Sequence, residues 1–449
     1  MSHKTLLLPS PALPGLLRIA RRTATILVLT ALCLVSKAQF LMDMIDTSKD
    51  MGRGMLSVYK KFDRIYMTGY LQPQFQWVQS KGAKSFGGGD FAPQVNNRYM
   101  LRRGRLRFDY ARLNADNQLS VYFAFQFEGS ERGVFIRDFW GKVFENRWQV
   151  FSLTAGMFAR PFGYEVNLAS IDRESPERGR MSQLLMKTER DLGAMISFEP
   201  RRKDHPLHHF KLDAGLFNGP GLSSPADYDS YKDFITRASL KPYALSKTVF
   251  LSGGLSFLYG GFLQNTRYIY RSGESNGIKT FIPDSSLSNL NTKAPRHYAG
   301  ADVQLKFKHK VGYTELRAEY WQGTQTATAG TSETPGALLT EPSYTRRFNG
   351  AFVYLLHNIV STHHQLGVKY DWYDPNTRVK GSDIGKPGSG LSATDIKYST
   401  LGFGYIYYIN DNLKLVLWYD IIKNESTQLA GYTSDLKDDL FTCRLQFRF

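Results

Sequence analysis

The strongest constraint on the fold is a two-residue alternation of apolar and polar side chains, which is clearest at the C-terminus. Across 441–449 every odd position is apolar and every even position is polar, and 119–128 repeats this pattern. Successive side chains of a strand point to opposite faces, so each such segment predicts a strand with one apolar and one polar face. In a chain built from these segments, one face of each strand needs an apolar environment and the other face needs water.

Sixteen segments with this character follow one another along the chain, and the even number is typical of an outer-membrane barrel. The predicted strands are 64–79, 99–112, 117–128, 133–145, 147–158, 190–199, 207–218, 233–242, 249–260, 298–309, 312–322, 345–356, 363–373, 396–409, 412–424 and 438–449.

The connections between these segments alternate between long and short. Gly-rich or Pro-bearing stretches at 219–232, 261–297, 323–344 and 374–395 all fall on one side, whereas tight turns near Asn146 and Asn410 fall on the other. Outer-membrane barrels have long outer loops and short periplasmic turns. We therefore predict an all-β protein, a transmembrane antiparallel barrel over 64–449. A soluble β-sandwich is the alternative, but the terminal Phe449 favours a last strand that closes a barrel against the first.

The N-terminus reads as a secretory signal peptide over residues 1–38. Three arginines (Arg18, Arg21 and Arg22) precede the apolar run 24–35, and Ser36-Lys37-Ala38 resembles a cleavage site. The run is too short for a membrane helix, which needs roughly 20 residues. We predict a mature start near Gln39, a short periplasmic segment over 39–63, and an outer-membrane location.

The charge balance points to anionic partners. The chain carries 57 Lys and Arg against 40 Asp and Glu, a net charge of +17. Residues 1–38 hold five basic and no acidic residues, so 52 basic residues remain against 40 acidic ones, a net charge of +12. Export argues against nucleic acid, which leaves outer-membrane lipid and lipopolysaccharide, or small anionic solutes such as phosphate. We expect no cofactor and no metal, because the His208-His209 and His363-His364 pairs fall near periplasmic turns.

The segment 101–110 places three arginines, Arg103, Arg105 and Arg107, on one face. An Arg facing lipid near the bilayer midplane costs about 2–4 kcal/mol, so this row is predicted to face the lumen. Guanidiniums in a water-filled lumen would attract anions. They could equally pair with carboxylates such as Asp109 and Glu128 and only fill the wall.

The chain also resembles the phosphate-selective porin O/P family. The similar stretches are RRGRLRF (102–108), FIRDFWGKV (135–143), GMFARPFGYE (156–165), SPERGR (175–180) and RDLGAMI (190–196). The resemblance implies a homotrimer of sixteen-stranded barrels with a basic path leading to a constriction. By motif, it carries anion contact to Arg103, Arg105, Arg107, Arg178 and Arg190.

The link 159–189 follows the fifth predicted strand, at the place where trimeric porins fold a loop into the lumen. It adds Arg160 and Arg180 to the candidate pore-lining residues. It also holds Glu165, Glu174 and Glu177, so the resemblance alone does not establish phosphate as the solute. A solvated loop with internal ion pairs is the other reading.

These observations together predict a passive, anion-favouring diffusion channel, possible solutes being phosphate or polyphosphate. A structural or adhesive barrel is the alternative function. We expect no enzyme and no catalytic residue: the one G-x-S-x-G stretch, 273–277, lies within a long loop and is interpreted as flexible loop sequence.

Overall fold

The computed structural model describes residues 65–449 except 115, 117 and 225. The predicted signal peptide (1–38) and N-terminal segment (39–63) lie outside the described residues. The part of the chain from Tyr66 to Phe449 forms one compact unit.

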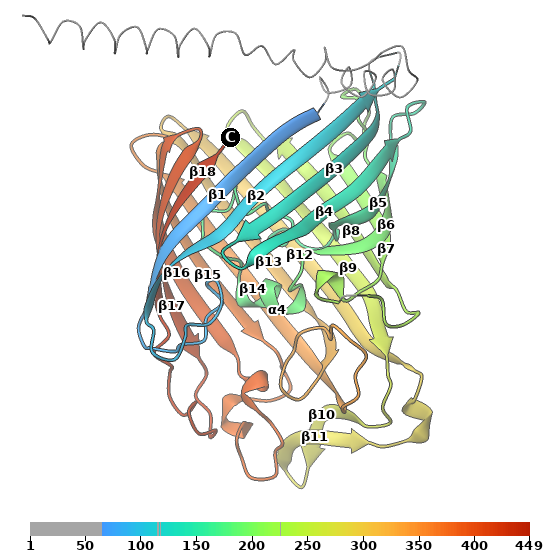
Figure 1. The fold of residues 1–449 in the computed structure, drawn as a ribbon, viewed down its shortest axis with the longest axis vertical. Helices are drawn as coiled ribbons and strands as arrows, with labels where there is room; N and C mark the ends of the chain where they lie inside the picture. Colours follow the sequence, from blue (N-terminus) through green and yellow to red (C-terminus); the bar gives the residue numbers. More distant parts are fainter. Residues whose placement is uncertain (1–64, 115, 117, 225) are drawn as a thin grey trace, which may run out of the picture. The chain divides into compact units, whose positions relative to one another are not determined.

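Within the described residues, sixteen antiparallel strands form a closed barrel, which confirms the predicted fold class (Figure 1). The wall strands are β1 (Ile65–Val78), β2 (Asn97–Leu113), β3 (Leu119–Ser130), β4 (Gly133–Phe144), β5 (Phe151–Ala159), β6 (Arg190–Phe198), β7 (Phe210–Phe217), β8 (Asp233–Ala244), β9 (Val249–Leu263), β12 (Lys293–His309), β13 (Gly312–Ala327), β14 (Ser343–Asn358), β15 (His364–Asp374), β16 (Tyr398–Asn410), β17 (Leu413–Asn424) and β18 (Leu440–Arg448).

The barrel closes between its first and last strands. β1 pairs with β18 from Tyr70 opposite Arg448 to Val78 opposite Leu440. Beyond this ladder, Gly69 and Phe449 exchange two backbone hydrogen bonds of 3.1 and 3.0 Å. The C-terminal residue therefore completes the pairing, and these two strands leave no unpaired edge.

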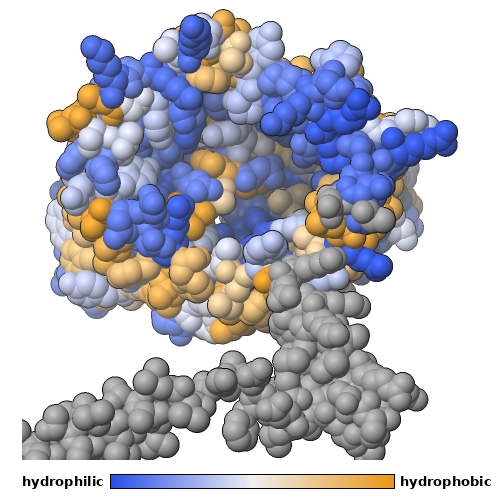
Figure 2. All heavy atoms as spheres, turned by 90° about the horizontal axis from the view of Figure 1, so that it is seen from above, coloured by the Kyte–Doolittle hydropathy of each residue, from blue (hydrophilic) through white to orange (hydrophobic). Residues whose placement is uncertain are grey.

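The wall side chains that point out of the barrel are exposed, whereas those that point into the barrel are buried. On β18, the even positions Thr442, Arg444 and Gln446 are buried inside the barrel, whereas Phe447 is 42% exposed on the outside. Only a protein with an apolar solvent around it tolerates this distribution. Figure 2 looks onto the end with the short turns and shows a hollow at its centre, where hydrophilic residues gather.

Short helices lie in the connections: α4 (Arg180–Leu185), η2 (Gly221–Ser223), η3 (Leu287–Asn289), η4 (Gly381–Asp383) and η5 (Ala393–Asp395). None of the helices in the described part of the chain is long and apolar enough to cross a membrane.

One long loop contains structure that the sequence analysis missed. Within 261–297, β10 (Ile269–Ser275) and β11 (Ile278–Asp284) form a hairpin at the end of the long loops (Figure 1). Its turn residues Asn276 and Gly277 have φ of +51° and +74°, the conformation that Asn-Gly favours in two-residue hairpins. The interpretation of 273–277 as flexible loop sequence was wrong: it is the ordered tip of this hairpin.

Candidate functional site

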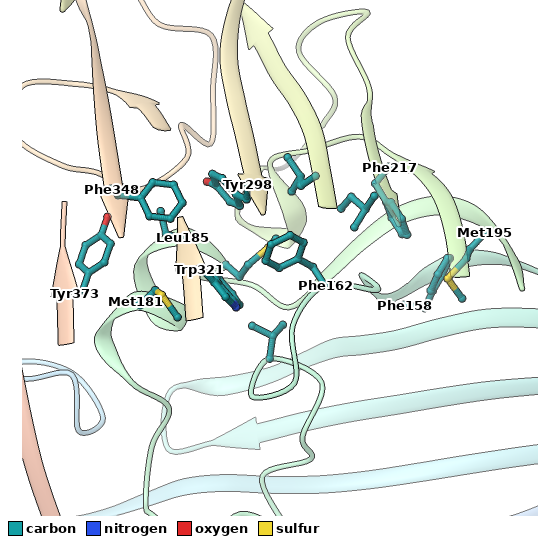
Figure 3. Packing of buried hydrophobic residues seen from close by; sticks show 14 residues of the cluster. Phe158, Phe162, Met181, Leu185, Met195, Phe217, Tyr298, Trp321, Phe348 and Tyr373 are labelled. Atoms are coloured by element: carbon teal, nitrogen blue, oxygen red, sulfur yellow. The ribbon is translucent and has the colours of Figure 1, made fainter. Parts of the chain in front are cut away.

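The segment 160–189 between β5 and β6, called here the inner loop, packs against inward-facing side chains of the wall. On one side it contributes apolar residues to a buried cluster with β6, β7, β8, β9, β12, β13, β14 and β15 (Figure 3). Its Phe162 ring lies 4.8 Å from that of Trp321 and 5.9 Å from that of Tyr298, both edge-on. This side of the loop is held by the hydrophobic effect.

A carboxylate of the wall holds the first turn of the inner loop. Glu319 on β13 accepts the backbone N–H groups of Tyr164 and Glu165 at 2.7 and 2.9 Å. The turn needs Gly163, whose φ is +70° and whose missing Cβ would lie 2.4 Å from a Glu319 carboxylate oxygen. The Pro161-Phe162-Gly163 sequence thus brings two donors onto one acceptor.

Three guanidiniums surround Glu177 at the other side of the inner loop. Its carboxylate lies 2.6 Å from Arg103, 2.8 Å from Arg444 and 2.9 Å from Arg102. Burial of Glu177 opposes ionisation, but the three positive charges outweigh it and hold its pKa well below the ordinary value. Arg102 and Arg103 are neighbours, which in a regular strand would point to opposite faces. Since both contact Glu177, β2 departs from regular alternation here, and sequence reasoning missed Arg102 for that reason.

Two more carboxylates anchor the inner loop elsewhere on the wall. Glu174 pairs with Arg317 of β13 at 2.8 Å, and Glu165 pairs with Lys369 of β15 at 2.5 Å. Glu177 pairs with β2 and β18, so the three carboxylates together join the loop to strands on several sides of the interior. A loop held at so many points has little freedom to move.

The predicted arginine row is interleaved with carboxylates. Arg103 pairs with Glu177, Arg105 with Glu128 at 2.6 Å, and Arg107 with Asp109 at 2.8 Å. Arg105 also donates a hydrogen bond of 2.9 Å to the hydroxyl of Ser170 in the inner loop. The three guanidiniums are therefore paired with carboxylates, as one of the two readings expects, and they also line a cavity.

The remaining predicted residues divide into two groups. Arg190 pairs with Asp138 at 3.1 Å, and Arg178 pairs with Glu189 at 3.2 Å. Burial opposes ionisation of Glu189, but Arg178, Arg137 and Arg190 hold its pKa well below the ordinary value.

The second group lies apart from the row. Arg160 donates to the carbonyl oxygens of Thr188 and Gly219. Arg180 on α4 stacks over the Tyr398 ring, 3.5 Å from its centroid.

A cavity of about 340 Å³, called here the basic pocket, lies between the inner loop and β1–β4 and β6. Four of the seven predicted residues meet in it: Arg103, Arg105, Arg107 and Arg190. Its charged side chains also include three arginines that the sequence analysis did not select, Arg137, Arg173 and Arg448, and one carboxylate, Glu189. Arg173 lies in the link 159–189 without a motif that marks it, and Arg137 carries no signal beyond its presence in FIRDFWGKV.

Guanidiniums outnumber carboxylates in and around the basic pocket. The described residues that line it, or that pair with its lining, include eight arginines: Arg103, Arg105, Arg107, Arg137, Arg173, Arg178, Arg190 and Arg448. The carboxylates among them are five: Asp109, Glu128, Asp138, Glu177 and Glu189. Eight guanidiniums against five carboxylates leave an excess of about three positive charges.

Arg173 is the least satisfied of these arginines. Its side chain is buried, and it donates one hydrogen bond of 3.2 Å to the carbonyl oxygen of Leu168. Within the described part of the chain, its Nε and Nη1 atoms have no hydrogen-bond partner and no carboxylate lies within ion-pair distance. Burial, followed by the charges of Arg103 and Arg178, lowers its pKa to about 10. A buried cation without a counter-charge is costly, so an anion in the basic pocket would stabilise Arg173.

A second cavity of about 500 Å³ lies beside the same stretch of the inner loop and shares Ile171 and Arg448 with the basic pocket. Its charges are mixed, with Lys306, Arg317 and Lys414 alongside Asp172, Glu174 and Glu315. The basic pocket is thus distinguished from this cavity by the sign of its charge.

His208 and His209 lie next to β7 in a turn of the short-turn end, with ring centroids 3.8 Å apart. No group of three or more metal-ligating side chains occurs in the described part of the chain.

The fold defines an outer-membrane barrel of the porin type: sixteen strands with apolar side chains outside, long loops at one end and short turns at the other. The protein is therefore a multi-pass β-barrel of the outer membrane. It is similar to OprB of Pseudomonas putida, with 10% identity, a TM-score of 0.51, and coverage of 89% of this chain and 96% of that one.

Two further solved structures match with lower TM-scores. OmpT of Vibrio cholerae, an outer membrane protein, matches over 86% of this chain and 97% of its own, with 11% identity and a TM-score of 0.46. A mutant of the Rh. blastica porin matches over 86% and 100%, with 10% identity and a TM-score of 0.43. No protein-family model matches this chain, and no curated protein matches it in sequence.

Proposed function

We propose that this barrel is a passive diffusion channel that favours small anions, and that the basic pocket is where these anions bind. The observation that carries the proposal is the excess of guanidiniums over carboxylates there, including the unpartnered Nε and Nη1 of Arg173. Positive charges in a narrow aqueous space of low surrounding dielectric attract anions and repel cations. We propose a channel and no enzymatic activity.

The chemistry of the pocket favours oxyanions. A guanidinium presents N–H donors in a planar fork that matches the oxygens of phosphate or carboxylate. The resemblance of RRGRLRF and its companion motifs to the phosphate-selective porin O/P family supports phosphate or polyphosphate as the solute, and a homotrimer as the assembly. Export through a signal peptide over residues 1–38 belongs to the same proposal.

A structural or adhesive barrel is the second candidate. The ion pairs that join the inner loop to β2, β13, β15 and β18 favour it, because they neutralise many of the arginines and fix the loop across the interior. The two candidates differ in one measurable property, since a purely structural barrel would not conduct selectively.

The test is the reversal potential of the purified protein in a planar bilayer under a gradient of KCl. We expect the wild type to prefer anions and Arg173→Gln to show a smaller preference. Added phosphate should also reduce the conductance of Arg173→Gln less than that of the wild type. Arg132→Gln is the matched control, because Arg132 is an exposed arginine of the 131–132 connection. A cation-selective wild type, or equal effects of the two variants, would contradict the proposal.

A further inference from the structure

A shallow groove of about 460 Å³ lies on the outside of the barrel, towards the end with the long loops. It crosses β9, β12, β13 and β14. The side chains of its lining that point outward are Phe257, His297, Ala299, Tyr320, Gln322, Thr324, Arg347 and Asn349, and Thr377 of the loop after β15 adds to its rim.

The lining is ordered by polarity along the strands. The pairing register places Tyr259, His297, Thr324 and Arg347 in one row across the four strands. The next row away from the loops is Phe257, Ala299, Gln322 and Asn349, and the third is Leu255, Ala301, Tyr320 and Ala351. The groove is therefore cationic and polar at its loop end and apolar farther along. It is hollow at Ala299, which is small among large neighbours. The third row continues this small surface beyond the lining with Ala301 and Ala351.

Arg347 gives the loop end of the groove its charge. It is exposed, and none of the described carboxylates lies within ion-pair distance of it. His297 stacks on the Tyr259 ring at 4.5 Å, and the Lys293 ammonium lies 4.9 Å from the centroid of the same ring. The nearest outward carboxylate in the register is Asp374, opposite Asn349, and it accepts the backbone N–H of Asn376 at 3.0 Å.

We propose that this groove binds one lipid of the outer leaflet, with a phosphate of its headgroup on Arg347 and an acyl chain over the alanines. The guanidinium fork matches phosphate oxygens, and a cation on a lipid-facing surface is stable only where it reaches the headgroup level. Basic pockets on the sides of membrane proteins bind phosphate headgroups in this way. Charge complementarity and the graded polarity select an anionic lipid over a second copy of the chain.

The experiment is native mass spectrometry of the whole mature barrel in a neutral detergent, titrated with lipid A and separately with phosphatidylethanolamine. We expect the wild type to retain lipid A in preference to phosphatidylethanolamine. Arg347→Gln should reduce the retention of lipid A roughly tenfold, the loss expected for a charge-assisted contact. Arg132→Gln removes the same charge from an exposed position at the same end of the barrel and should leave retention unchanged.

Ala299→Phe fills the groove without changing any charge and should also reduce retention. Unchanged heat-modified mobility on a gel would show that each variant is folded. Equal retention by Arg347→Gln and the wild type, equal loss in Arg132→Gln, or equal retention of both lipids would overturn the proposal. A change in oligomeric state of Arg347→Gln by light scattering would overturn it as well, because the groove would then be a protein contact.

Discussion

Arg444 donates a hydrogen bond of 2.8 Å to the carboxylate of Glu177, and so joins the strand that closes the barrel to the loop that occupies its interior. Arg103 approaches the same carboxylate from β2, at 2.6 Å. One buried anion thus bridges two of the strands at the closing seam, β2 and β18, which lie on either side of β1. Closure of the wall and placement of the inner loop depend on each other.

Removal of this anion should destabilise the barrel. In Glu177→Gln three guanidiniums lose their counter-charge, and those of Arg103 and Arg444 are buried. Breaking a buried ion pair costs roughly 3–5 kcal/mol. Denaturant unfolding in detergent micelles, followed by tryptophan fluorescence, measures this loss. Glu333→Gln is the control, because Glu333 pairs with the exposed Lys187 and such surface pairs contribute about 0–1 kcal/mol. Equal losses in both variants would mean that Glu177 does not hold the loop.

The ion pairs of the inner loop should persist in mild acid. The pKa values of Glu177 and Glu189 are held well below 4.5, the ordinary value for Glu. The stability that these ion pairs contribute is complete above about pH 4.5 and is lost as the pH falls through the lowered pKa values. The ion pairs of this loop should therefore change the conductance and the unfolding midpoint little between pH 8 and 5. Both quantities should decrease when the pH is below about 4. An increase in susceptibility of the loop to protease between pH 7 and 5 would contradict this prediction.

The turn at the start of the inner loop should tolerate no side chain at Gly163. A non-glycine residue at its φ of +70° costs about 1–2 kcal/mol by itself, and the added Cβ would lie 2.4 Å from Glu319 and 2.6 Å from Trp321. Gly277→Ala separates the two effects: Gly277 has a φ of +74°, but no other atom lies within 4 Å of the Cβ position. Gly163→Ala should lower the free energy of unfolding clearly more than Gly277→Ala does. Similar losses would show that the contact with Glu319 is not tight.

The last residue should contribute to closure mainly through its backbone. Deletion of Phe449 removes both hydrogen bonds to Gly69, each of which contributes about 0.5–1.5 kcal/mol. Phe449→Leu keeps them. Refolding from urea into detergent, scored by heat-modified mobility, should give a lower yield for the deletion and a nearly normal yield for Phe449→Leu. The reverse order would mean that the aromatic ring, and not the backbone pairing, completes the barrel.

The sequence alone determined the wall strands and the face of most of their side chains, because alternation is a local property. Thr442 and Phe447 differ in polarity whatever the rest of the chain does, and the apolar surrounding then decides which one faces outward. The alternation of long and short connections likewise determined the strand count and the two ends. The sequence did not predict the β10–β11 hairpin, because its Gly-rich stretch, 273–277, resembles a loop and lacks the alternation of a wall strand.

Tertiary structure alone decided which charges meet. Glu177 lies 267 positions before Arg444 in the chain, and no local pattern relates the two residues. The departure of β2 from regular alternation, which turns Arg102 inward beside Arg103, likewise depends on the carboxylate that both contact. Among the described residues Arg173 has no ion-pair partner, because the folded loop directs Glu174 to Arg317 and Glu177 to β2 and β18. An electrostatic site depends on distances in space between residues remote in sequence, and only the folded chain determines those distances.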